Sequence, residues 1–363
     1  MIIDIIAGAR PNFMKIAPII EAIENAKSNG HNINYRLVHT GQHYDSKMSG
    51  DFFTQLGIPE PHLNLGAGGG SQAEQTSAIM IGYEKAIMDQ RPDLVVVVGD
   101  VTSTMACSVN AKKMNNITVA HVEGGIRSRD LTMPEEINRL VTDAITDLFF
   151  TTSESANQNL KNEGVPKDKI HFVGNTMIDT LLKQMTNFRK PDFFDKLELK
   201  VGVYIVMTLH RPANVDAGEQ LSKLIQTIVE SSNGIPLIFP VHPRTAAMIE
   251  KTGISYPNLH MVEPMGYLEF NYLVQNSKAV ITDSGGITEE TTVMGIPCMT
   301  LRDNTERPET ITVGTNELLG TNPDAIPPAM EKLFSGHWKK GSIPEMWDGK
   351  TAGRIVEVLL TLK

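Results

Sequence analysis

The sequence has few of the residues that would tie the chain to a metal, a disulfide framework or a membrane. It has two cysteines in 363 residues, Cys107 and Cys298, far apart and in apolar surroundings. This spacing suits neither a zinc site nor a redox pair, so we expect two buried thiols. No run of about 18 consecutive apolar residues occurs, and no basic leader precedes Ile2. The sequence therefore predicts a cytoplasmic protein without a membrane partner.

Net positive charge is also lacking. Lys and Arg total 33 against 42 Asp and Glu, which gives a formal net charge of −9. Such an excess of negative charge argues against a general nucleic-acid partner, so any phosphate group must meet individually placed cations. A hydrophobic content of 41% and a charged content of 21% are ordinary for a globular enzyme whose core needs no metal or disulfide.

Apolar runs of strand length alternate with helical patterns along the whole chain. Several runs, such as Leu94–Val98, are continuous in Val, Ile or Leu, as in parallel strands buried on both faces. We expect strands at Ile2–Ala7, Tyr35–His39, Leu94–Val98, Ile117–Val122, Leu148–Thr151, Ile170–Val173, Val203–Leu209, Leu237–Val241, His260–Val262 and Ala279–Thr282. The alternation predicts an α/β fold with parallel sheets.

So many strands exceed one small sheet, and the pattern breaks near Gly174. We therefore expect two doubly wound, Rossmann-like domains that face each other across a cleft. The predicted division places the first domain at residues 1–173 and the second at residues 174–345. A helix within residues 346–363 is expected to pack back on the first domain.

Ionisable residues follow most of the predicted strands. In open parallel sheets, ligands bind beyond the carboxyl ends of the strands. The residues at these positions are Arg10, Asp100, Glu123, His210, His242 and Asp283, with Lys15 in the first turn of the helix after the first strand. Any one of them could simply end a strand, but together they indicate a polar site.

The most informative segment follows the last predicted strand, where Ser284-Gly285-Gly286 opens a helix. Serine can cap a helix start, and two glycines let a ligand approach the backbone closely. Free N–H groups and the helix dipole then suit a pyrophosphate. Glu290 lies about one turn further on, where its carboxylate could accept hydrogen bonds from ribose hydroxyls. An ordinary strand–turn–helix crossover is the alternative, but Glu289, Arg302 and Arg307 nearby favour a nucleotide-diphosphate site.

Glu135 has a structural interpretation as well as a functional one. Thr132 and Glu135 have the spacing of a capping box with Pro134 in the first turn, and Glu135 and Arg139 could form an i,i+4 pair. For cofactors the sequence predicts none. A Gly-x-Gly-x-x-Gly pattern is missing after the first strand, and His39 and His43 have no flanking acid that would suggest a metal site.

The strand-end residues and their neighbours resemble one known family along nearly the whole chain. The matching segments, in order, are Gly8–Lys15, Gly99-Asp100, His121–Arg127, Pro134–Arg139, His210-Arg211, Pro240–Pro243, Asp283–Gly286 and Thr305–Glu309. Together they resemble the non-hydrolysing UDP-N-acetylglucosamine 2-epimerases. The resemblance implies the two-domain glycosyltransferase-B fold and a homodimer. It also implies a reaction that inverts C2 of UDP-N-acetylglucosamine, giving UDP-N-acetylmannosamine for surface polysaccharides.

In this family UDP is eliminated to give 2-acetamidoglucal and is then added back with protonation on the other face. The resemblance assigns roles residue by residue. Asp100, Glu123 and Glu135 correspond to the carboxylates that act on the C2 proton, with Lys15 and Arg139 as charged neighbours. The departing pyrophosphate is assigned to Arg10, His210, Ser284, Gly285 and Gly286. Glu290 corresponds to the ribose clamp, Arg307 to a cation on the nucleotide side, and His242 lines the cleft.

Some positions depart from the family pattern. Pro212-Ala213 replaces an acidic residue after His210-Arg211, and the Thr40–Asp45 segment differs from the type found with an allosteric substrate site. These departures leave open a substrate of a sister group, UDP-2,3-diacetamido-glucuronic acid. A glycosyltransferase of the same fold and a non-catalytic nucleotide-sugar sensor are further alternatives. Neither of these two needs three carboxylates in the first half of the chain.

Overall fold

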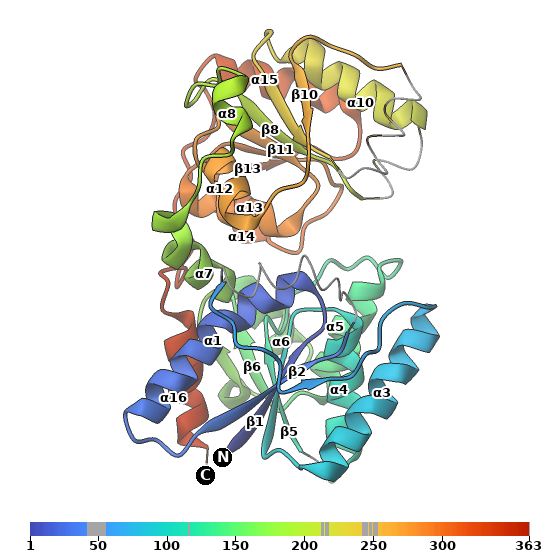
Figure 1. Cartoon of the computed structure of the whole chain (residues 1–363), viewed down its shortest axis with the longest axis vertical. Coiled ribbons are helices and arrows are strands. Elements are labelled where there is room, and N and C mark those ends of the chain that lie inside the picture. The colour runs from blue at the N-terminus through green and yellow to red at the C-terminus, as the bar shows by residue number, and fades with distance from the viewer. Residues whose placement is uncertain are drawn as a thin grey trace. The chain divides into compact units, whose positions relative to one another are not determined.

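The protein is described by a computed structural model that covers residues 1–41, 56–114, 117–211, 214, 218–241, 246, 249 and 253–362. The chain forms two compact units (Figure 1). The first comprises Met1–Lys183 together with Glu345–Lys363, and the second comprises Gln184–Pro344. In the described part of the chain, no helix is long and apolar enough to cross a membrane.

The first unit is built on a parallel sheet of seven described strands in the order β3-β2-β1-β4-β5-β6-β7. The strands are β1 (Ile2–Ala7), β2 (Asn34–His39), β3 (Leu63–Asn64), β4 (Leu94–Val98), β5 (Thr118–Val122), β6 (Leu148–Thr151) and β7 (Ile170–Phe172). Its helices are α1 (Arg10–Ser28), α3 (Gln72–Asp89), α4 (Thr102–Lys113), α5 (Pro134–Ile145), α6 (Glu154–Asn162), α7 (Thr176–Gln184) and α16 (Thr351–Thr361), with a 3₁₀ turn at Lys167–Lys169.

Helices cover both faces of this first sheet. Helix α1 packs against α16, and α4 packs against α3 and α5. Figure 1 shows α1 with α16 on one side of the sheet and α3 with α4 on the other. Because neither face of β4 meets solvent, all five of its residues are buried, which explains why this strand is a continuous apolar run.

The second unit contains a parallel sheet of six described strands in the order β10-β9-β8-β11-β12-β13. The strands are β8 (Ile205–Thr208), β9 (Leu237–Pro240), β10 (Leu259–Val262), β11 (Ala279–Thr282), β12 (Cys298–Thr300) and β13 (Asn316–Leu318). Its helices are α8 (Phe193–Lys196), α10 (Gly218–Ser231), α12 (Tyr267–Gln275), α13 (Gly285–Met294), α14 (Pro308–Thr312) and α15 (Ile326–Phe334), with 3₁₀ turns at Met185–Asn187 and Pro323–Ala325. One core lies between the sheet and α10 and α15, and a second lies on the opposite face.

The prediction of an α/β fold with two parallel sheets is confirmed. Three short strands were not expected, β3, β12 and β13, because two or three residues are too few to show a pattern. Cys107 and Cys298 are both buried and unpaired.

The first unit extends past the expected boundary at residue 173 and resumes at Glu345. Helix α7 is fastened to it by its own side chains. The Thr180 hydroxyl donates to the Met14 carbonyl at 2.6 Å. The Asp179 carboxylate accepts the backbone N–H groups of Thr351 and Ala352 at 3.1 and 2.7 Å, which caps the start of α16. These contacts place α7 and α16 in the first unit.

Candidate functional site

The turn from β1 to α1 is held by a residue that sequence reasoning missed. The Asn12 side-chain oxygen accepts the backbone N–H groups of Gly8 and Ala9 at 3.1 and 2.9 Å. Its amide nitrogen donates to the Val98 carbonyl at the end of β4, at 3.0 Å. Asn12 therefore ties two strand ends together. Capping asparagines are common, so its spacing alone gave no signal.

The same strand ends bring Lys15 and Glu123 together. The Lys15 ammonium lies 2.7 Å from the Glu123 carboxylate, and Glu123 is buried. Glu123 has a φ of 73°, a left-handed conformation that costs a non-glycine residue about 1–2 kcal/mol. A Cβ on Gly99, whose φ is 69°, would lie 3.3 Å from the Lys15 nitrogen. The sequence-predicted neighbours Lys15, Gly99 and Glu123 are thus in contact range.

Asp100 and Arg139 form the next part of this group. Arg139 donates to one oxygen of the Asp100 carboxylate from Nη2 at 2.5 Å and from Nε at 3.1 Å. Its third nitrogen donates to Glu136 at 2.6 Å. Asn138 donates from its side chain to the Asp100 carbonyl at 2.9 Å. Asp100 keeps 32% of its side chain exposed, so a carboxylate oriented by Arg139 remains open to a ligand.

The expected capping box at Glu135 is wrong. Helix α5 begins with Met133 at its N-cap and has no side-chain capping bond. Thr132 instead bonds to Asp130. Glu135 is exposed, and the structure gives it no ion pair with a described residue. Glu136 takes the structural role, because its carboxylate accepts the N–H groups of the backbone at 128 and 129 and pairs with Arg139.

Behind these carboxylates lies a buried charged network that the sequence did not single out as one. His121 Nδ1 lies 2.6 Å from the Asp143 carboxylate, and its Nε2 lies 2.8 Å from the Gly99 carbonyl. Asp143 also accepts the Gly125 N–H at 2.9 Å and pairs with Arg127 at 2.7 Å. Burial acts to raise the pKa of Asp143, but these partners together hold it below its ordinary value.

In the second unit, His210 follows β8 and meets Asp283, which follows β11. The His210 ring nitrogen Nδ1 lies 2.5 Å from the Asp283 carboxylate, while 62% of the His210 side chain is exposed. Asp283 also accepts from the Arg211 N–H at 2.9 Å and the Asn214 amide at 3.0 Å. Burial opposes ionisation of Asp283, but the bond and charge of His210 and these donors lower its pKa to about 2. An ionised Asp283 therefore holds the His210 ring at the carboxyl ends of β8 and β11.

The start of α13 lies directly beside this pair. Ser284 occupies the N-cap position, but its hydroxyl makes no capping bond, so the expected serine cap is wrong. The Ser284 N–H instead donates to the Thr282 hydroxyl at 3.0 Å. Gly285 and Gly286 begin the helix and are partly exposed. Their N–H groups lie in the first turn, where an α-helix has no internal acceptors for them, so this end suits an anion.

Glu290 is buried in the same helix, next to side chains of α12. Burial raises the pKa of Glu290 to about 7, and the Glu289 carboxylate adds to the rise, whereas Tyr267 and Asn271 oppose it. Tyr267 in turn has its pKa raised by burial and by Glu290. A carboxyl group near half-ionisation at neutral pH is common at functional sites.

The neighbouring cations are paired with acids rather than isolated. Arg307 pairs with Glu289, and Arg302 donates to Glu306 at 2.7 Å. All four residues are buried. A Cβ on Gly285 would lie 3.6 Å from the Arg302 guanidinium. Arg302 therefore places positive charge beside the α13 start, while Arg307 is held by its pair with Glu289.

Some predicted residues lie outside this description. His242, the Pro212-Ala213 pair and the segment after Gly41 are outside the described residues, as is the side chain of Arg10. The described residues contain no group of three or more His, Cys, Asp or Glu able to hold a metal ion.

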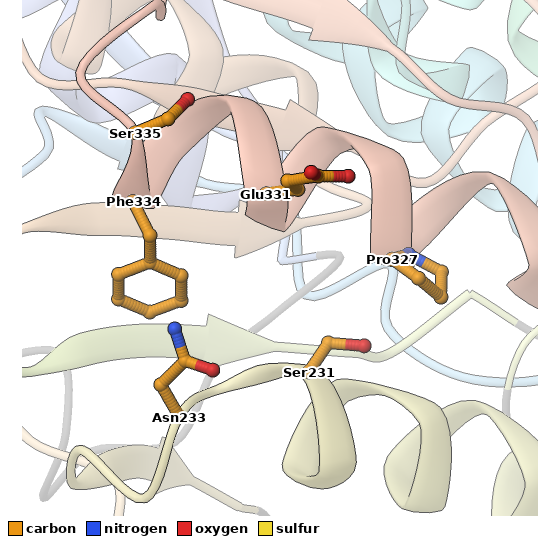
Figure 2. A pocket seen from close by; sticks show the side chains of 6 residues that line it. All are labelled: Ser231, Asn233, Pro327, Glu331, Phe334 and Ser335. Carbon is orange, nitrogen blue, oxygen red and sulfur yellow. The ribbon is translucent and has the colours of Figure 1, made fainter.

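A pocket of about 320 Å³ lies between α15 and the end of α10, with the Phe334 ring facing Asn233 (Figure 2). Its lining residues are Ser231, Asn233, Pro327, Glu331, Phe334 and Ser335. Ser231 and Asn233 precede β9, so the pocket lies at the amino ends of the strands. His210 and Ser284 lie at the carboxyl ends. With no cation in its lining, it does not suit a phosphate.

Comparisons with known proteins agree with this arrangement. A family model described as UDP-N-acetylglucosamine 2-epimerase matches residues 25–360. The UDP-N-acetylglucosamine 2-epimerase of Methanocaldococcus jannaschii is 40% identical over 99% of both chains. The UDP-2,3-diacetamido-2,3-dideoxy-D-glucuronate 2-epimerase of Pseudomonas aeruginosa is 38% identical over 88% of this chain and 89% of its own. The crystal structure of M. jannaschii UDP-GlcNAc 2-epimerase in complex with UDP-GlcNAc and UDP gives a TM-score of 0.87 at 39% identity, covering 99% of each chain.

Proposed function

The chain belongs to the UDP-N-acetylglucosamine 2-epimerase family, and we propose that it interconverts UDP-N-acetylglucosamine and UDP-N-acetylmannosamine. The observation that carries the proposal is the pairing of two strand-end carboxylates with cations, Glu123 with Lys15 and Asp100 with Arg139. Two carboxylates fixed in this way suit proton transfer to and from one carbon atom.

The reaction requires both loss and return of the C2 proton. This proton is not next to a carbonyl, so we propose that a carboxylate removes it as the C1–O bond to UDP breaks. The products of this step are 2-acetamidoglucal and UDP. Readdition of UDP with protonation on the opposite face gives the epimer. We assign the acid/base work to Asp100, Glu123 and Glu135, with Lys15 and Arg139 as the charged neighbours that orient them.

The second unit is proposed to hold the nucleotide. The N–H groups of Gly285 and Gly286 and the Ser284 hydroxyl, which makes no capping bond, suit the departing pyrophosphate, with His210 placed beside them by Asp283. Glu290 is proposed to accept the ribose hydroxyls. We assign Arg10, Arg307 and His242 to the same nucleotide from the family pattern.

Solvent exchange tests the reaction directly. The chain is incubated with UDP-N-acetylglucosamine in heavy water without an acceptor, and C2 is followed by NMR. We expect deuterium at C2 together with UDP-N-acetylmannosamine. Release of UDP without deuterium at C2 would indicate a transferase or hydrolase and overturn the proposal.

A second substrate needs the same assay, because the diacetamido-glucuronate epimerase of P. aeruginosa is 38% identical to the chain. The two substrates differ by an acetamido group at C3 and a carboxylate at C5. Comparison of kcat/KM for the two UDP-sugars decides between them. A higher value for the diacetamido uronate would reassign the substrate and leave the elimination chemistry unchanged.

A homodimer is part of the proposal. Helix α3 exposes Ile81 and Met88, seven residues apart on one face, and α5 exposes Ile137 and Val141. Exposed apolar side chains on these two helices, which both pack against α4, favour burial against a second copy. Light scattering should show a dimer that Met88→Glu weakens, while Met261→Glu in the second unit does not. An unchanged dimer in Met88→Glu would exclude the α3 face.

We also propose a cytoplasmic location. Both cysteines are buried and unpaired, which suits a reducing compartment. Fractionation of cells followed by detection of the protein tests this assignment.

A further inference from the structure

The turns that follow β4 and β5 both contact one buried pair, His121 and Asp143. The first turn joins β4 to Asp100 through Gly99, and the second joins β5 to Gly125 through Glu123. Gly99, Glu123 and Gly125 all have positive φ, at 69°, 73° and 81°. Glycine adopts a positive φ readily, whereas the left-handed conformation of Glu123 persists only where its surroundings hold it. Backbone bonds supply part of this, because the Gly99 N–H donates to Val122 at 3.0 Å.

His121 contacts both turns from beneath. Its Nε2 lies 2.8 Å from the carbonyl of Gly99, the residue before Asp100. Its Nδ1 lies 2.6 Å from Asp143, whose other oxygen accepts the Gly125 N–H at 2.9 Å. His121 has no exposed surface. The pair therefore forms a continuous link from the Asp100 turn to the turn that carries Glu123.

The two ring nitrogens of His121 have different partners. A carbonyl oxygen can only accept, so Nε2 carries a proton. The other oxygen of Asp143 accepts from the Gly125 N–H and pairs with Arg127. Burial acts to raise the pKa of Asp143, but His121, Arg127 and the Gly125 N–H lower it below its ordinary value. Asp143 is therefore an acceptor, and both ring nitrogens of His121 face acceptors. Arg127 also pairs with Glu163 at 2.6 Å, which extends this network toward the surface.

We propose that His121, hydrogen-bonded to Asp143 and to the Gly99 carbonyl, is the positioning residue that fixes Asp100 and Glu123 relative to each other. The inference rests on the proposed function, since it concerns the two carboxylates assigned there. His121 touches neither carboxylate through its own hydrogen bonds and acts through the Gly99 carbonyl and Asp143. Its loss should therefore impair turnover without weakening the hold on the nucleotide.

The kinetic test compares two neutral variants with a matched histidine. His121→Gln keeps a donor toward Gly99 and loses the one toward Asp143, and His121→Asn does the reverse. In both, kcat should fall by about 100-fold while KM and the UDP dissociation constant stay within about threefold. His171→Gln is the control, since His171 lies in β7 outside this network and is half-buried; its kcat should stay within about twofold. Equal losses in His121→Gln and His171→Gln would overturn the inference.

A double variant separates a shared role from two independent ones. Asp143→Asn should lower kcat as His121→Gln does, and the combined variant should lose no more than about threefold beyond the worse single variant. Losses that multiply would show that the two residues do not act as one link.

Two measurements decide the inference without turnover. ¹⁵N NMR of the wild-type protein should show a proton on both His121 ring nitrogens, because each nitrogen faces an acceptor. Amide exchange at Gly99 and Gly125 should be at least about tenfold faster in His121→Gln and unchanged in His171→Gln. A ring with a single N–H, or unchanged exchange, overturns the inference even for an active enzyme. If the wild-type protein incorporated no deuterium at C2 of the UDP-sugar, that result would instead contradict only the proposed function.

Discussion

At the scale of single residues, the two carboxylates with cation partners are the sharpest candidates for proton transfer. Asp100→Asn and Glu123→Gln should each lower turnover by about 100-fold or more, because the amide cannot take up the C2 proton. UDP binding should be retained. Asp147→Asn is a matched control in the same unit, since Asp147 pairs with Lys112 elsewhere. Steady-state kinetics with calorimetry of UDP binding measures both effects.

Glu135 belongs in the same series as the decisive case. It is exposed on α5 and has no capping role, so Glu135→Gln should leave the melting temperature unchanged. A loss of turnover like that of Asp100→Asn would identify it as a proton-transfer group. Near-normal turnover would remove it from the set.

Glu290 gives a prediction about pH. Burial and Glu289 raise its pKa from 4.5 to about 7, against Tyr267 and Asn271. The folded protein thus holds this proton more tightly than the unfolded chain. The contribution of protonated Glu290 to the free energy of unfolding is fully present below about pH 4.5 and is lost as the pH rises through about 7. Relative to the wild type, Glu290→Gln should gain up to roughly 3 kcal/mol between these limits, because one pKa unit is about 1.4 kcal/mol.

UDP binding should show the matching dependence. Ribose hydroxyls donate to an ionised carboxylate, so wild-type affinity should rise by up to about tenfold from about pH 6 to about pH 8. The ionisation of UDP itself also changes over this pH range, but it contributes equally to wild type and Glu290→Gln. The difference between their calorimetric pH profiles therefore reports Glu290 alone. The exposed Glu331→Gln, in the pocket of Figure 2, controls for a general charge effect. Parallel pH profiles for wild type and Glu290→Gln would contradict the ribose assignment.

At the scale of elements, the start of α13 separates stability from binding. Gly285 has no positive φ, and an added Cβ would meet only the Arg302 guanidinium, at 3.6 Å. Gly285→Ala should therefore hold or raise stability by up to about 1 kcal/mol. It should weaken UDP binding by about tenfold or more if pyrophosphate approaches this backbone.

A second helical glycine supplies the control for that substitution. In α16, a Cβ added to Gly353 would meet no atom within 4 Å, so Gly353→Ala should stabilise without changing UDP binding. Thermal melting and calorimetry on both variants give the comparison. Equal UDP affinity in Gly285→Ala and wild type would move the pyrophosphate away from α13.

Helix α16 gives a prediction about the first unit. Leu359 and Ile355 are buried on the face of α16 that packs in this unit. Leu359→Ala should cost about 2–5 kcal/mol, and the loss should fall on unfolding of the first unit. Leu333→Ala, buried in the second unit, is the matched control. Urea unfolding followed by amide exchange distinguishes the units, and equal effects on both would contradict their separate cores.

At the scale of the whole molecule, the reaction should need no bound cofactor. The elimination and readdition involve no net oxidation or reduction, and the sequence shows neither a dinucleotide fingerprint nor metal-ligand spacing. Turnover should therefore survive chelation and extensive dialysis unchanged. Activity that disappears on this treatment and returns with a divalent ion or a nicotinamide dinucleotide would reveal a missed site. Heat-denatured protein carried through the same treatment controls for contaminating catalysts.

The sequence by itself determined the fold class and the places where polar residues end strands. Continuous runs such as Val95–Val98 need two covered faces, so they indicated parallel sheets without any tertiary information. Because the carboxyl ends of parallel strands lie on the same side of a sheet, the sequence also indicated that Lys15, Asp100 and Glu123 belong to one site. The family motifs added their assigned chemistry.

Tertiary structure decided which group each polar residue meets. Glu135 and Glu136 are indistinguishable in sequence, and only the rotation of α5 exposes the first and turns the second toward Arg139. The pairing of His121 with Asp143 joins residues 22 positions apart, a contact that no local pattern encodes. Short strands such as β12 exist because neighbouring strands provide hydrogen bonds for them. Local periodicity fixes which face of an element is buried, whereas partners across the core are set by packing.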